Sequence, residues 1–168
     1  TFGGYSRYDV SSEPDQPAPW PIASLFLARA YTEARNSEKV WRIVNWLNSI
    51  NGGKSGGFFE RYGPSITPPA PPVGVVGWAW SEIVSLICEN IMGVRPGLDH
   101  LVLRPHLIDG INEMNGRFKI RGIDVSVLLR RSVEQPSVMV NGRKVAMQNG
   151  TLTMKYPSGG SLNIEMNV

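Results

Sequence analysis

The hydrophobic period of this chain changes near Gly97, and that change constrains the fold more than any other feature. Before Gly97, apolar residues recur with the spacing of helices. After it, apolar and polar residues alternate, as in half-buried strands. Composition changes at the same place, because all five Trp and ten of the 13 Pro precede Gly97 and five of the six Met follow it. We therefore predict an α+β chain, with a helical region over residues 1–96 and a small antiparallel β-sandwich domain over residues 97–168.

Three helices are predicted in the first region, over residues 20–35, 37–50 and 80–92. The first and third are apolar around most of their circumference, so we expect other helices to enclose them. The second has a single apolar face and should be half-exposed. A long segment rich in Gly and Pro separates the second helix from the third, and loops of this length in compact domains are usually functional or disordered.

Composition narrows the range of ligands and partners. The net charge is only +3, and no Lys/Arg cluster suited to phosphates stands out, so we expect no nucleic-acid partner. The longest apolar runs are far shorter than the roughly 18 residues that span a bilayer, so no membrane partner is expected. The single cysteine, Cys88, excludes an intrachain disulfide and is interpreted as an inert buried thiol. His100 and His106 are spaced poorly for one metal ion, so we predict neither a metal nor a cofactor.

Aromatic residues, arginines and carboxylates gather in the segments beside the predicted helices, at residues 7–9, 19–20, 58–62 and 78–81. Saccharide sites use these residue types, because aromatic faces pack on the C–H faces of sugar rings and charged groups bind hydroxyls. A carboxylate is also needed to activate water against an anomeric carbon. The alternative is that the tryptophans only pack the helices and that Glu60 forms a surface ion pair with Arg61 or Lys54.

The order of these segments resembles the closing third of the glucoamylase-like glycoside hydrolases, which are (α/α)₆-barrel enzymes. Residues 97–132 are similar instead to the β-sandwich that follows the same barrel in bacterial α-L-rhamnosidases. The motifs that carry the two resemblances are Gly4–Asp9, Pro19-Trp20, Phe59–Tyr62, Gly77–Ser81, Leu101–Pro105 and Gly116–Gly122. The resemblance implies C-terminal hairpins of an (α/α)₆ barrel, followed by a small β-sandwich, in an inverting glycoside hydrolase that acts on α-glucans or α-rhamnosides.

The same resemblance implies a role for six residues. Glu60 matches the general base that deprotonates the attacking water. The matching general acid belongs to an earlier hairpin, upstream of Thr1. Arg7 and Asp9 are implied to bind sugar hydroxyls, and the aromatic residues to stack on or wall the sugar. These aromatic residues are Trp20, Tyr62 and Trp80.

The length of the chain limits what it can do alone. A barrel of twelve helices needs at least ~300 residues, and this chain has 168. We therefore expect a C-terminal part of a larger hydrolase that is inactive by itself. Its partners would be the glycoside substrate and, through exposed helix faces, the remainder of the barrel or a second copy. The alternative function is a non-catalytic module that binds carbohydrate or another protein.

Overall fold

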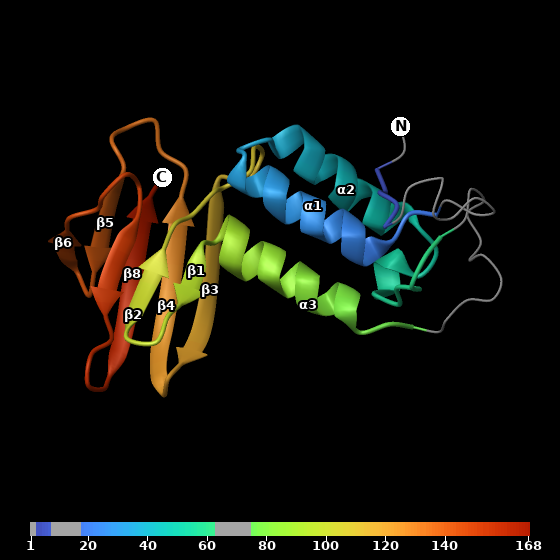
Figure 1. The fold of residues 1–168 in the computed structure, drawn as a ribbon. Coiled ribbons are helices and arrows are strands. Elements are labelled where there is room, and N and C mark those ends of the chain that lie inside the picture. Colours follow the sequence, from blue (N-terminus) through green and yellow to red (C-terminus); the bar gives the residue numbers. More distant parts are fainter. Residues whose placement is uncertain (1–2, 8–17, 63–74) are drawn as a thin grey trace. The chain divides into compact units, whose positions relative to one another are not determined.

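The computed structural model describes residues 3–7, 18–62 and 75–168 (Figure 1). The chain folds as two compact units, Thr1–Leu86 and Ile87–Val168. We call these the helical unit and the β unit. The boundary falls between Leu86 and Ile87, whereas the sequence analysis placed it after Pro96.

Helix α1 (Pro21–Glu33) begins at a proline whose fixed φ suits the first helical turn. Trp20 is its N-cap residue, with an extended backbone at φ −110°. The Trp20 carbonyl accepts hydrogen bonds from the Ser24 backbone N–H at 3.0 Å and from the Ser24 hydroxyl at 2.8 Å. The Pro-Trp-Pro sequence therefore sets both the start of α1 and the direction from which the chain enters it.

The other two helices differ slightly from their predicted bounds. Helix α2 (Ser37–Ser49) is capped by Asn36, whose side chain accepts a hydrogen bond from the Lys39 N–H. Helix α3 (Trp78–Ser85) begins two residues early and passes into a π-helical segment over Leu86–Ile91. A short 3₁₀ turn, η1 (Gly53–Ser55), follows α2.

Within the helical unit, α1 contacts both α2 and α3 (Figure 1). Leu25 and Ala28 of α1, Ile43 of α2 and Ala79 of α3 have completely buried side chains. An ion pair between α1 and α3 adds to this packing. The faces of α1 and α3 turned away from this core are exposed, including Phe26 and Val84. The predicted enclosure of these two helices is therefore not observed.

The prediction of hairpins from an (α/α)₆ barrel is wrong. The described residues form a mixed α+β fold with three α-helices and eight strands, and more of them lie in the strands than in the α-helices. A barrel hairpin places each inner helix among helical neighbours, whereas α1 and α3 each leave an apolar face uncovered. The apolar circumference of these helices was thus misinterpreted, because a helix can be apolar on a face that no neighbouring helix covers.

The β unit contains two sheets (Figure 1). They share one core of buried aliphatic side chains and Met. One sheet has the strand order β1 (Val94–Pro96), β2 (His100–Leu103), β7 (Leu152–Lys155). The other has the order β3 (Glu113–Ile120), β4 (Ile123–Arg130), β8 (Ser161–Asn167), β5 (Ser137–Val140), β6 (Arg143–Val145).

The prediction of an antiparallel β domain also needs correction, because β8 pairs with β4 in parallel. The remaining pairings in both sheets are antiparallel. Asn141-Gly142 forms the turn that joins β5 to β6, with φ values of 49° and 75° that suit a type I′ hairpin. Alternation shows which face of a strand is buried, but it does not reveal the neighbouring strand or its direction.

Candidate functional site

A hollow of about 310 Å³ lies at the N-terminal ends of α1 and α3 in the helical unit. Its lining is mostly apolar and is formed by Arg7, Trp20, Ile22, Ala23, Phe26 and Trp78. The hollow thus brings together two of the residues predicted to bind sugar, Arg7 and Trp20. It also includes two aromatic residues, Phe26 and Trp78, to which the sequence analysis gave no sugar-binding role.

Backbone hydrogen bonds on both sides hold the segment that carries Trp20. The Trp20 N–H donates to the carbonyl of Tyr5 at 2.9 Å, and the Tyr62 N–H donates to the carbonyl of Pro19 at 3.0 Å. Ser6 and Pro19 also form an antiparallel bridge. Three segments that are distant in the sequence therefore meet beside the hollow, so the position of Trp20 depends on the tertiary structure.

Arg7 and Trp20 form a cation–π pair, with the Arg7 guanidinium carbon 5.1 Å from the centre of the indole ring. The Arg7 side chain is exposed, whereas Trp20 is only 6% exposed. Trp20 thus offers little free surface for a sugar to stack on. The exposed aromatic surface of the hollow belongs to Trp78 and Phe26, which are 42% and 53% exposed.

Tyr62 fixes the loop that carries Glu60. Its side chain is only 2% exposed, and its hydroxyl donates to the carbonyl of Asn51 at 2.8 Å and accepts from the Phe59 N–H at 3.0 Å. Its ring also meets the indole of Trp46 edge-on, with 6.2 Å between centroids. Burial raises the pKa of the Tyr62 phenol above its usual 10.0. A direct contact between Tyr62 and substrate stays a prediction.

Glu60 is half-buried in the loop between Phe59 and Tyr62. Within the described ranges, its carboxylate forms no hydrogen bond or ion pair. The alternative of a surface ion pair with Arg61 or Lys54 is therefore not observed. Only Arg61 lies between Glu60 and Tyr62, so the Cα atoms of Glu60 and Tyr62 are at most about 7 Å apart. Because the Tyr62 backbone N–H is hydrogen-bonded to the Pro19 carbonyl, the loop that carries Glu60 adjoins the segment that carries Trp20.

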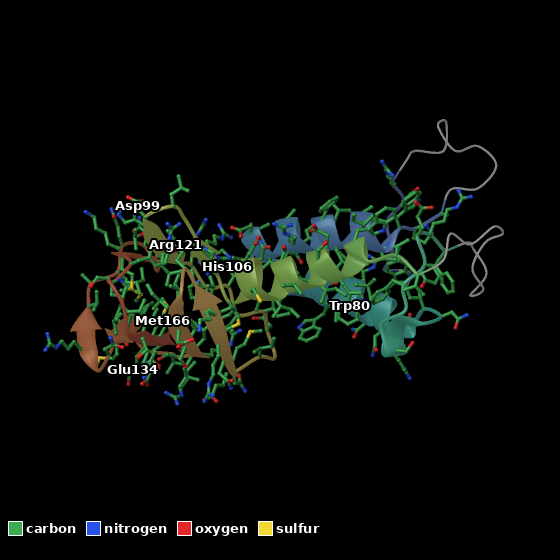
Figure 2. The ribbon with its side chains drawn as sticks, turned by 90° about the horizontal axis from the view of Figure 1, so that it is seen from below. Trp80, Asp99, His106, Arg121, Glu134 and Met166 are labelled. Atoms are coloured by element: carbon green, nitrogen blue, oxygen red, sulfur yellow. The ribbon has the colours of Figure 1, made fainter. Side chains whose placement is uncertain are left out.

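Trp80 attaches the other end of this loop to α3 and does not line the hollow. Figure 2 labels Trp80 on α3. Its indole N–H donates to the carbonyl of Gly56 at 2.8 Å, and its ring meets the buried ring of Phe58 edge-on, with 6.2 Å between centroids. Successive helical positions are rotated by about 100°, so residues 78 and 80 lie on different sides of α3. The helical spacing could have shown that only one of the two tryptophans faces the hollow.

An ion pair links the two helices beside the hollow. Arg29 Nη1 of α1 and Glu82 Oε2 of α3 lie 2.7 Å apart, and both side chains are largely buried. Glu82 is therefore committed to a structural contact. Asp9, the remaining predicted sugar contact, lies outside the described residues. No carboxylate belongs to the described lining of the hollow.

Metal-binding groups and membrane-spanning helices are two other features that could define a site. Over the described ranges, no group of three or more His, Cys, Asp or Glu side chains could hold a metal ion. His100 Nδ1 lies 2.6 Å from Asp99 Oδ1, while His106 is buried. None of the described helices is long and apolar enough to span a membrane.

Comparison with known proteins leaves the functional interpretation to the residues themselves. No protein-family model matches the chain, and no curated protein matches it significantly. The resemblance to glycoside hydrolases thus depends on short motifs, and the functional conclusion depends on the geometry of the hollow and of the loop that carries Glu60.

Proposed function

We propose that the helical unit binds a saccharide in the hollow and belongs to an inverting hydrolase of α-linked glycosides, with Glu60 as general base. The observation that carries the proposal is the exposed indole of Trp78 in a hollow that Arg7 also lines, next to a loop whose Glu60 carboxylate forms no hydrogen bond or ion pair with the described residues. The indole would pack on the C–H face of a sugar ring, and the guanidinium would donate hydrogen bonds to its hydroxyls.

In this reaction Glu60 removes a proton from water as the water oxygen bonds to the anomeric carbon. The glycosidic C–O bond breaks, and a general acid protonates the leaving oxygen. Inverting enzymes hold the two carboxyl groups about 6.5 to 9.5 Å apart to leave room for the water. Because the described lining of the hollow supplies no acid, we expect this chain to bind glycosides without hydrolysing them.

A substrate that needs no acid tests Glu60 directly. In α-glucosyl and α-rhamnosyl fluoride, fluoride leaves without prior protonation, so a general base alone can promote attack by water. We expect fluoride release by the chain to exceed the buffer rate and to saturate with substrate, and Glu60→Gln to lower it to the buffer rate. Glu38→Gln is the matched control, because Glu38 is an exposed carboxylate on α2. Equal release by the two variants would refute the role of Glu60.

The absence of an acid in the described lining favours a second function, non-catalytic carbohydrate binding. Titrating the chain with maltotriose and with methyl α-rhamnoside, monitored by NMR, separates the two. For both functions, Trp78→Ala should weaken binding at least tenfold, while Trp41→Ala should not, because Trp41 lies outside the hollow. If binding depends on Trp78 but Glu60→Gln leaves fluoride release unchanged, the non-catalytic function is the one that survives.

A further inference from the structure

We propose that the β unit carries a second binding site, on the outer face of its five-stranded sheet, for a sugar that bears a carboxylate. An open hollow of about 600 Å³ lies there over β3, β4 and β8. Its outward-facing side chains are those of Arg117, Lys119, Asp124, Ser126, Ser161 and Asn163. This site is independent of the hollow in the helical unit and of the function proposed for it.

The strand register arranges these six side chains in two rows. Arg117 pairs with Ser126, which pairs with Asn163. The neighbouring row has Lys119 on β3, Asp124 on β4 and Ser161 on β8. Strands are about 4.8 Å apart and alternate residues about 6.7 Å apart, so the rows outline a patch of roughly 10 by 7 Å. A patch of this size accommodates one or two sugar rings.

The polar side-chain groups of the first row are available to bind a ligand. In the described part of the chain, the Arg117 guanidinium, the Ser126 hydroxyl and the Asn163 side-chain amide form no hydrogen bond or ion pair. The Asn163 backbone N–H is already used, because it donates to the side chain of Asn141 at 2.8 Å. An incoming ligand would therefore meet a guanidinium fork, a hydroxyl and an amide side by side.

The charges of the second row select the ligand. Lys119 Nζ and Asp124 Oδ1 lie 3.8 Å apart, and both side chains are largely exposed, so this pair is weak. With Arg117 included, the hollow carries one net positive charge. A planar monoanion that can accept two parallel N–H bonds from Arg117 suits this charge, and a carboxylate has that geometry. The Asp124 carboxylate would oppose a phosphate dianion.

The polar floor of the hollow indicates that the carboxylate belongs to a saccharide. Ser126, Ser161 and Asn163 supply groups that donate to and accept from hydroxyls. Phe118, the only aromatic residue among the described residues that line this hollow, packs against the core on the inner side of the sheet, so it offers no stacking face. Without stacking, a neutral sugar would bind only through hydrogen bonds that compete with water, and the ion pair with Arg117 has to supply the affinity.

NMR titration of the whole chain with trigalacturonate tests the proposal, with maltotriose and inorganic phosphate as comparison ligands. We expect trigalacturonate to shift the amide signals of Arg117, Ser126 and Asn163 and, judged by these signals alone, to bind at least tenfold more tightly than maltotriose. Arg117→Gln should weaken that binding at least tenfold. The matched control, Arg143→Gln, removes an exposed arginine from β6, outside the hollow, and should change it less than twofold.

Two further outcomes would overturn the proposal. Equal binding of trigalacturonate by the Arg117 and Arg143 variants would show that Arg117 is not the anchor. Tighter binding of phosphate than of trigalacturonate would show that the hollow is a phosphate site. The Asp124→Asn variant should change the affinity in the opposite direction to Arg117→Gln. Removing the negative charge should strengthen binding of trigalacturonate severalfold. Weaker binding by this variant would contradict the charge argument.

Discussion

The substitution Gly56→Ala tests how the loop that carries Glu60 is attached to α3. Gly56 has φ +75°, in the left-handed region that alanine adopts only with strain. A Cβ at this position would overlap Cζ2 of the Trp80 indole, well inside the 3.4 to 4 Å of ordinary contact. The indole would have to move, although its N–H donates to the carbonyl of the same glycine at 2.8 Å.

Three contributions determine the cost of this substitution. The left-handed backbone costs alanine about 1 kcal/mol. Losing the hydrogen bond from the Trp80 indole costs about 1 kcal/mol, and losing its edge contact with Phe58 costs about 1 kcal/mol more. We therefore expect Gly56→Ala to lower the unfolding free energy of the helical unit by about 3 kcal/mol. In a Trp80→Ala background only the backbone contribution, about 1 kcal/mol, should remain.

Urea unfolding monitored by tryptophan fluorescence measures these costs. All five tryptophans lie between residues 20 and 80, so the signal reports on the helical unit. The four proteins of the cycle are wild type, Gly56→Ala, Trp80→Ala and the double variant. We expect a coupling energy of about 2 kcal/mol between the two sites. An equal cost of Gly56→Ala in both backgrounds would refute the idea that the indole holds this loop.

Two further outcomes are expected. For the ion pair between Arg29 and Glu82, a double-mutant cycle with Gln at each position should give a coupling of about 1 kcal/mol, because both side chains are largely buried; coupling below roughly 0.3 kcal/mol would contradict this. Burial and, to a smaller extent, the negative charge of Glu89 raise the pKa of the Cys88 thiol above 9.0. Ellman's reagent at pH 8 should therefore react more slowly with Cys88 than with glutathione. Because the pKa of Cys88 is raised in the folded state, its contribution to the free energy of unfolding is fully present below pH 9 and is lost as pH rises above 9. Equal reaction rates of Cys88 and glutathione would exclude the raised pKa.

Much of the local structure could be predicted from neighbouring residues. Pro21 starts α1, and Asn141-Gly142 forms the hairpin turn between β5 and β6. The apolar residues of β4 and β8 face the core, as the alternation after Gly97 predicts. These features depend on backbone dihedrals and on contacts within a few residues, which the sequence specifies directly.

The candidate site could be predicted only in part. The motifs identify Arg7 and Trp20, which do line the hollow, and the segment that contains both Trp78 and Trp80. They do not reveal that Trp78 faces the hollow while Trp80 binds the Gly56 carbonyl. The helical spacing places the two indoles on different sides of α3, but the contacts that decide which indole faces the hollow join residues far apart in the chain.

Contacts between distant residues also determine the features that were predicted wrongly from the sequence. The apolar circumference of α1 and α3 predicted enclosure in a helical barrel, yet Phe26 and Val84 are exposed. Alternation in β8 showed its buried face but not its parallel pairing with β4. The type of a residue indicates how strongly its side chain favours burial. Which residues then surround that side chain depends on how distant segments of the chain pack together. The hydrophobic pattern therefore predicted the secondary structure, while the exposed aromatic face at the hollow emerged only from the packing of those segments.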